Sequence, residues 1–151
     1  MLPFVRTLEQ ARAMRGYLDT VHNLRSGEDG LKIILMSELP SNAILARQFI
    51  QEFDGFSIGS NDMTQMVLAT DRDNSSLSHI YDEEDPAVVW AILVTIFSGQ
   101  KFGKKVASAA KAWQTAKCCA ASWPSAASPP PPSCPIPTTA RSGTRRRRSP
   151  E

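Results

Sequence analysis

Cysteine and histidine are scarce in this 151-residue sequence, and this narrows the chemistry that it can carry. The three cysteines are odd in number and lack the spacing of a zinc site, so the sequence supports neither a disulfide framework nor structural zinc. Of the two histidines, we expect His22 on a helix surface and His79 in a loop. Any chemistry of the chain is therefore expected to rest on carboxylates.

Long apolar runs are missing as well. The longest, residues 88–97, is about half of the roughly 20 residues that a membrane-spanning helix needs, so we expect it to be the buried face of a packed helix. Met1 leads directly into a predicted strand and a charged helix, which does not resemble a signal peptide. These absences predict a cytoplasmic protein without a membrane partner.

The net charge of +2 combines two segments of different composition. Residues 1–106 carry a net charge of −4, whereas residues 107–151 carry +6, all three cysteines and a dense run of proline. The first segment can bury a core, and we expect the second to be a disordered, low-complexity tail. Its prolines 129–132 could form a polyproline ligand. Its arginines 145–148 could contact nucleic acid, but without interleaved aromatic residues this signal is weak, and we expect no nucleic-acid partner.

Strand and helix patterns alternate along the first segment. We predict strands at residues 2–5, 31–36 and 56–58 and the start of a fourth at 104–106. We predict helices at about 7–24, 41–53, 63–70 and 86–103, and a polar, acidic loop at 71–85. Thr7 and Asp85 are expected to cap the first and last of these helices, and the helix at 41–53 places Ile44, Leu45, Phe49 and Ile50 on one face. This order predicts an α/β fold with parallel strands. It amounts to about half of a (β/α)8 barrel of about 250 residues, so we expect an incomplete barrel, its second half.

Two carboxylates follow two of the predicted strands. Glu38 comes after the strand at 31–36, and Asp62 follows the strand at 56–58 in the run Gly59-Ser60-Asn61-Asp62. Parallel strands end at a common edge, and Mg²⁺ prefers one or two carboxylates together with water and substrate oxygens. Backbone N–H groups of Gly59 and Ser60 at a helix start suit an anionic ligand, and the Asn61 amide can donate to a phosphate or carbonyl oxygen.

These residues also have structural interpretations. Glu38 could pair with a base inside the fold, and Asp62 could be a first-turn acid favoured by the helix dipole, which is compatible with metal binding. Taken alone, Gly59-Ser60-Asn61-Asp62 is more often a helix-capping turn than a site. Arg6 could face a ligand or solvent. The strand before this run and Glu38 beside it favour a binding site.

Four motifs in one order resemble a known family. They are Met1-Leu2-Pro3-Phe4-Val5-Arg6-Thr7, Met36-Ser37-Glu38-Leu39-Pro40-Ser41-Asn42, the run from Asp54 to Gln65, and Leu68-Ala69-Thr70-Asp71-Arg72-Asp73. Residues 1–106 are thereby similar to the C-terminal phosphoenolpyruvate (PEP)-binding barrel of the PEP-utilising enzymes, in the PEP synthase (pyruvate, water dikinase) branch. Its relatives, pyruvate phosphate dikinase and the sugar-phosphotransferase enzyme I, usually carry Gly-Thr-Asn-Asp where this chain has Gly59-Ser60-Asn61-Asp62.

The resemblance implies Mg²⁺ held by Glu38 and Asp62, with Gly59, Ser60 and Asn61 joining them around pyruvate or PEP. It implies a reaction that converts ATP, pyruvate and water to PEP, AMP and phosphate. The reactive cysteine, the arginines of earlier strands, the ATP site and the phosphohistidine domain have no counterpart here. We therefore expect a fragment that is inactive alone, with no catalytic residue retained and the missing N-terminal part as a partner. A fragment of either relative, a binding module that uses the tail, and a non-catalytic pseudogene product stay open.

The tail has the character of a shifted reading frame. By the resemblance, residues 104–106 should continue as Gly-Ile-Cys-Gly-Glu-Gly-Met. Written in GC-rich codons and read after removal of the first base, this segment becomes Ala-Ser-Ala-Ala-Lys-Ala-Trp, which is the sequence of residues 107–113. We hypothesise that a single-base frameshift near codon 107 produced the tail.

Overall fold

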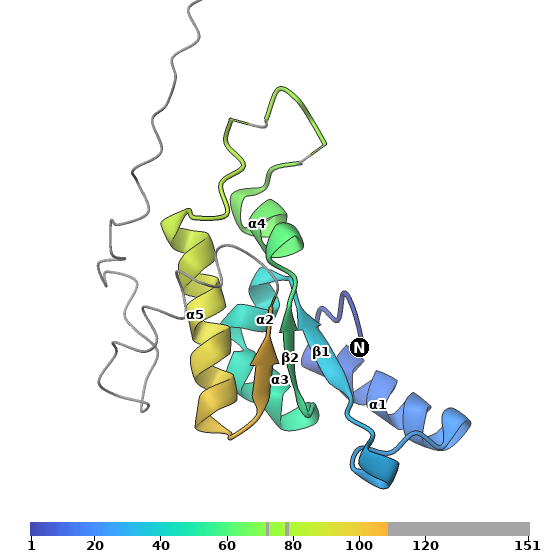
Figure 1. The fold of residues 1–151 in the computed structure, drawn as a ribbon. Coiled ribbons are helices and arrows are strands. Elements are labelled where there is room, and N and C mark those ends of the chain that lie inside the picture. Colours follow the sequence, from blue (N-terminus) through green and yellow to red (C-terminus); the bar gives the residue numbers. More distant parts are fainter. Residues whose placement is uncertain (72, 78, 109–151) are drawn as a thin grey trace, which may run out of the picture.

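The structure, a computed structural model, describes residues 1–71, 73–77 and 79–108 (Figure 1). The predicted disordered tail lies almost entirely outside the described residues, from position 109 onward.

The centre of the fold is a parallel three-stranded sheet. Its strands are β1 (Ile34–Ser37), β2 (Gly55–Ile58) and β3 (Lys105–Ala107), in the order β1-β2-β3. Leu35 pairs with Phe56, and Phe56 with Val106. Helices connect the strands, so the predicted α/β class with parallel strands is confirmed, as an open partial sheet (Figure 1).

The predicted first strand, residues 2–5, is wrong. Leu2 makes one isolated parallel bridge to Leu35: its N–H donates to the Ile34 carbonyl, and its own carbonyl accepts from Met36 N–H, both at 2.9 Å. The ladder stops there because Phe4, the next residue whose N–H would face β1, adopts a left-handed backbone with φ of 52° and donates to the Glu38 side chain instead. The segment therefore lies beside β1 without forming a strand.

Five α-helices and a short 3₁₀ turn (Glu28–Gly30) complete the described residues. The helices are α1 (Leu8–His22), α2 (Pro40–Ile44), α3 (Ala46–Glu52), α4 (Ser60–Leu68) and α5 (Pro86–Lys101). The predicted starts of the first and last are confirmed. Thr7 Oγ1 accepts from Gln10 N–H at 3.1 Å, and Asp85 Oδ1 accepts from Ala87 N–H at 2.8 Å.

The predicted helix at 41–53 is two helices. Leu45, with φ of −105° and ψ of 25°, leaves the helical range and separates α2 from α3. Phe49 and Ile50 are fully buried as expected, but the change of direction at Leu45 leaves Ile44 69% exposed. The predicted core face is therefore correct for Phe49 and Ile50, and Leu45 packs against the same core, but Ile44 is not buried in it.

Helix α5 packs against β2, β3 and the three helices α2, α3 and α4. Eleven of its 16 residues are buried, so the run at 88–97 belongs to the core, as predicted. No described helix has both the length and the apolarity to cross a bilayer. A second part of the core joins Leu35, Phe49, Phe53 and Phe56 between the sheet and α3.

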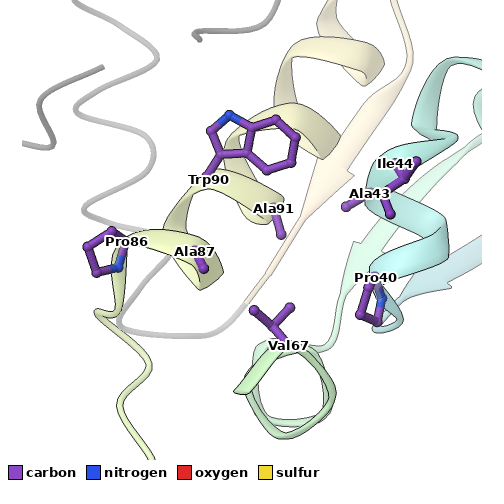
Figure 2. Close-up of a pocket in the computed structure, with 8 residues that line it drawn as sticks. All are labelled: Pro40, Ala43, Ile44, Val67, Pro86, Ala87, Trp90 and Ala91. Carbon is purple, nitrogen blue, oxygen red and sulfur yellow. The ribbon is translucent and has the colours of Figure 1, made fainter. Parts of the chain in front are cut away.

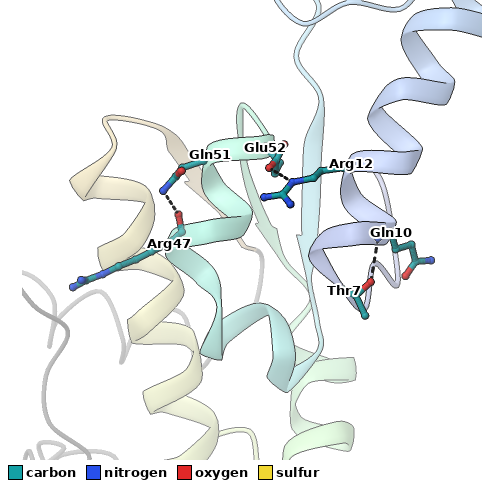
Figure 3. A network of polar contacts seen from close by, with 6 residues as sticks. All are labelled: Thr7, Gln10, Arg12, Arg47, Gln51 and Glu52. Carbon is teal, nitrogen blue, oxygen red and sulfur yellow. Dashed lines mark hydrogen bonds and ion pairs between the residues drawn. The ribbon is translucent and has the colours of Figure 1, made fainter.

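Helix α1 is attached to α3 on the outside of the fold (Figure 3). Arg12 Nε contacts Glu52 Oε1 at 2.8 Å, and Gln51 Nε2 donates to the Arg47 carbonyl at 3.1 Å. The Arg12 side chain is 66% exposed, so its ion pair with Glu52 contributes at most about 1 kcal/mol.

The face of the sheet opposite α3 is less covered. Ile34, Met36 and Ser57 are half-buried there, and Lys105 and Ala107 are exposed.

Candidate functional site

Glu38 begins the site at the carboxyl end of β1. It follows Ser37, the last residue of the strand, and only 1% of its surface is exposed. Its Oε1 accepts a hydrogen bond from Phe4 N–H at 2.7 Å. No basic side chain is described in contact with it, so the ion pair that was the structural alternative for Glu38 is absent from the described residues.

Gly59 connects β2 to α4 next to Glu38. Its N–H donates to the Ser37 carbonyl at 3.1 Å, continuing the pairing in which Ser37 lies opposite Ile58. A Cβ atom on Gly59 would lie 3.0 Å from Oε2 of Glu38. The absence of a side chain at this position lets the second carboxylate oxygen lie directly over the turn.

Helix α4 starts at Ser60, three residues earlier than predicted. Met63 N–H donates to the Gly59 carbonyl at 2.9 Å, so Ser60, Asn61 and Asp62 form the first helical turn. The first N–H groups of a helix have no acceptor within it and, with the helix dipole, favour an anion. Asp62 is half-buried in this turn, on the side of Glu38.

Asn61 faces the loop that follows α4. It is exposed, and the Tyr81 hydroxyl donates to its carbonyl oxygen at 3.2 Å and lies 3.5 Å from its Oδ1. Ser60, by contrast, is 4% exposed. The four residues of the predicted turn therefore divide into a buried serine, an exposed amide in contact with Tyr81, and a glycine and an acid beside Glu38.

The surroundings of Glu38 disfavour the negative charge of its carboxylate. Burial raises the pKa of Glu38, the hydrogen bond from Phe4 N–H lowers it, and the negative charge of Asp62 raises it again, leaving the pKa above its ordinary value. The two carboxylates are therefore close enough to repel each other. A cation between them would remove this repulsion.

The donor set suits Mg²⁺. Glu38 offers a buried carboxylate oxygen and Asp62 a second carboxylate, and the first turn of α4 offers backbone N–H groups that have no acceptor within the helix. The N–H of Gly59, which was predicted to suit an anion, is instead bonded to the Ser37 carbonyl. Within the described residues, no group of three or more His, Cys, Asp or Glu side chains could hold a metal ion. Two carboxylates are nevertheless sufficient, because Mg²⁺ in proteins usually keeps waters and takes its remaining ligands from substrate oxygens.

A separate apolar pocket of about 450 Å³ lies between α2, α4 and α5 (Figure 2). Its lining is Pro40, Ala43, Ile44, Val67, Pro86, Ala87, Trp90 and Ala91. None of these side chains carries a carboxylate, amide or hydroxyl group, so the pocket does not suit a cation or a small anionic acid. It shares no residue with the predicted site.

Arg6 and two further residues complete the surroundings of Glu38. Arg6 is exposed, and its guanidinium donates to the Phe4 carbonyl at 3.3 Å. Asn42 and Phe4 were not predicted as part of the site. Asn42 stands in the quoted motif with Glu38, which was the available signal. Phe4 stands in another of the four motifs, but its contribution is a backbone N–H presented by a left-handed conformation, which no side-chain pattern indicates.

Comparison with known proteins identifies the family of this chain. The family described as "PEP-utilising enzyme, PEP-binding domain" matches residues 1–114. The chain belongs to this family. Among curated relatives of the PEP-utilising enzymes, it is 52% identical over 106 residues to the phosphoenolpyruvate synthase of Escherichia coli (strain K12), and 51% identical over 106 residues to that of Neisseria meningitidis serogroup B.

These PEP-utilising relatives are much longer than the matched segment. Each match covers 70% of this chain but only 13% of the relative. The same proportions hold for the phosphoenolpyruvate synthase of Pseudomonas aeruginosa, which is 49% identical over 106 residues. The matched segment of 106 residues thus corresponds to about one eighth of the length of these relatives.

Proposed function

We propose that this chain contributes part of the Mg²⁺ and pyruvate/PEP site of a phosphoenolpyruvate synthase, in the second half of a (β/α)8 barrel. The observation that supports this most directly is the pair of neighbouring carboxylates, Glu38 and Asp62, at the common carboxyl end of two adjacent parallel strands. Active sites of (β/α)8 barrels lie at this end of the strands.

Each residue of the site has its own role in this proposal. Glu38 and Asp62 hold Mg²⁺, which when bound supplies the positive charge that stabilises negative oxygens of the three-carbon acid. The N–H of Ser60 at the start of α4 and the Asn61 amide orient the carboxylate or phosphate of the substrate. Gly59, whose own N–H is bonded to the Ser37 carbonyl, leaves room beside them for the Glu38 carboxylate. Because Glu38 is buried and fixed by Phe4 N–H, it enters the site already oriented.

The complete reaction, from ATP, pyruvate and water to PEP, AMP and phosphate, needs groups that this segment does not offer. An ATP site, a phosphohistidine carrier, further arginines and a proton-transferring cysteine would come from the rest of the enzyme. We therefore propose that the 151-residue chain acts as a partial site and does not turn over alone. Purified chain with ATP, pyruvate and Mg²⁺ should form no pyruvate-dependent AMP, and clear turnover would contradict this proposal.

The metal site is tested directly by titration calorimetry of the 151-residue chain with Mg²⁺. We expect one site per chain, and we expect Glu38→Gln and Asp62→Asn each to weaken binding by at least tenfold. Asp71→Asn is the matched control, since Asp71 lies outside the site and its substitution should leave binding unchanged. Equal binding by the parent chain and the double variant Glu38→Gln/Asp62→Asn would refute the assignment.

We further propose that residues 107–151 are read out of frame. The support is the change in composition after Val106 and the recovery of Gly-Ile-Cys-Gly-Glu-Gly-Met by a one-base shift. The gene itself is the test: a single added base near codon 107 should restore this segment. If no one-base change there does so, the proposal fails.

A further inference from the structure

Asn42 lies at the junction of β1, α2 and the N-terminal segment. It is completely buried, and its amide makes three hydrogen bonds to backbone groups. Oδ1 accepts from Glu38 N–H at 3.3 Å and from Leu39 N–H at 3.1 Å, while Nδ2 donates to the Val5 carbonyl at 2.7 Å. One side chain therefore joins segments that are 37 positions apart in the chain.

These bonds close a ring around Glu38. From the backbone of Glu38 the ring runs through Asn42 to Val5, along the chain to Phe4, and from Phe4 N–H back to Oε1 of Glu38 at 2.7 Å. Both ends of the glutamate, its backbone and its carboxylate, are thus held by the same structure. The other carboxylate oxygen, Oε2, lies over Gly59.

We propose that Asn42 is a positioning residue for Glu38: it ties the N-terminal segment to the end of β1, so that Phe4 N–H engages Oε1 and Oε2 stays directed toward the cation side of the turn. The proposal rests on the proposed function for the role of the cation. The hydrogen-bonded ring itself does not depend on it. Phe4 holds a left-handed backbone that a non-glycine residue adopts only when its surroundings require it, which is the conformation that a fixed anchor at Val5 would impose.

The experiment uses the ¹⁵N-labelled 151-residue chain, its Asn42→Ala and Asn42→Asp variants, and Ser26→Ala as a control. Ser26 lies in the loop before β1 and donates to Asp54, the residue that precedes β2. Loss of this hydrogen bond should affect stability away from the site. Two quantities are measured: hydrogen-exchange protection of the Phe4 amide by NMR, and the Mg²⁺ dissociation constant by calorimetry. A merely structural role for Asn42 would lower the melting temperature without changing either.

We expect Asn42→Ala to reduce Phe4 protection and to weaken Mg²⁺ binding by about tenfold, at the lower end of the effect of residues that orient metal ligands. Asn42→Asp keeps the acceptor for Glu38 and Leu39 but loses the donor to Val5, so it should produce the same two changes even if Asn42→Ala fails to fold. Ser26→Ala should change neither.

Three outcomes would overturn the inference. The first is a rapidly exchanging Phe4 amide in the unaltered chain, whatever the variants show. The second is full protection of the Phe4 amide in Asn42→Asp. The third is unchanged Mg²⁺ affinity in a folded Asn42 variant. Absence of Mg²⁺ binding by the unaltered chain would instead refute the proposed function, and the Phe4 amide would still decide whether Asn42 holds the ring.

Discussion

Gly59 and Glu38 are in such close contact that a Cβ atom on Gly59 would lie 3.0 Å from Oε2 and 3.2 Å from Cβ of Glu38. Both distances are shorter than ordinary van der Waals contact, so a side chain at this position must displace the carboxylate by a few tenths of an ångström. We expect Gly59→Ala to fold and to bind Mg²⁺ roughly threefold to tenfold more weakly, as measured by calorimetry. Unchanged affinity would show that Oε2 has no role in binding.

Gly16 provides the matched control for that substitution. It lies inside α1, and a Cβ atom there would meet nothing within 4 Å. Since glycine in the middle of a helix costs about 0.5–1 kcal/mol relative to alanine, Gly16→Ala should increase the free energy of unfolding by about that amount. Mg²⁺ affinity should not change. Thermal or urea unfolding with and without Mg²⁺ measures both quantities.

Replacing Glu38 with glutamine should stabilise the fold while removing the metal ligand. The pKa of Glu38 is raised in the folded state, so its contribution to stability is full below its unfolded pKa and is lost as pH rises through the folded pKa. Glu38→Gln removes this loss, so the variant should exceed the parent in unfolding free energy at pH 7 and not at pH 3. Chemical denaturation at both values measures the difference.

Magnesium should reverse that order. A ligand at 100 times its dissociation constant stabilises the protein that binds it by about 2.7 kcal/mol. At that Mg²⁺ concentration the parent should gain about this amount, whereas Glu38→Gln, with at least tenfold weaker binding, should gain about 1.4 kcal/mol or less. A variant that gains as much from Mg²⁺ as the parent would show that the cation binds elsewhere.

Asp54 should show the opposite dependence on pH. Burial raises its pKa, but the hydrogen bonds from Ser26 and Ile33 N–H and the charges of Arg15 and Lys104 outweigh burial and leave the pKa below its ordinary value. Its stabilising contribution is therefore complete above the unfolded pKa and is lost as pH falls through the folded pKa. Ser26 Oγ lies 2.6 Å from each carboxylate oxygen, and Ile33 N lies 2.8 Å from Oδ2.

We expect Asp54→Ala to cost about 2–4 kcal/mol at pH 7, because hydrogen bonds to a charged group contribute about 1.5–3 kcal/mol each and are not additive. Urea unfolding at pH 7 and in acid should show the gap between parent and variant narrowing as Asp54 becomes protonated. A constant gap would mean that the carboxylate acts through its shape alone.

Substitution of Lys104 should lower the stability of the fold more than substitution of its neighbour Lys105. Nζ of Lys104 donates to the carbonyls of Ile50 and Phe53 at the end of α3, where a cation also complements the helix dipole, whereas Lys105 is exposed. Lys104→Met should lower the unfolding free energy by about 1–3 kcal/mol. Lys105→Met should stay within about 0.5 kcal/mol of the parent. Similar losses for both would exclude a capping role.

The elements that could be predicted from the sequence are those with local signals. The caps at Thr7 and Asp85, the two strands that end before Glu38 and Asp62, and the buried face of α5 all follow from residues close together in the chain. The bend at Leu45 has no such signal, because every residue from 41 to 53 is compatible with a helix. The same holds for the left-handed backbone of Phe4.

The site could be predicted only in part, for the same reason. Glu38 and Asp62 could be predicted because acids at the ends of parallel strands form a recognisable pattern. The ring that holds Glu38 could not be predicted, because its hydrogen bonds join Phe4 to Glu38 and Val5 to Asn42 across 34 and 37 positions. Contacts of this separation depend on how the elements pack, which periodicity and caps do not report.

The register of the sheet has a consequence for the order of folding. Pairing of β1 with β2 joins Ile34 to Gly55, 21 positions apart, whereas pairing of β2 with β3 joins Gly55 to Lys105, 50 positions apart. Closing the longer loop costs about 0.8 kcal/mol more in chain entropy. We expect β3, whose residues are the least buried of the three strands, to be added late, so substitutions in it should speed unfolding and leave the folding rate nearly unchanged.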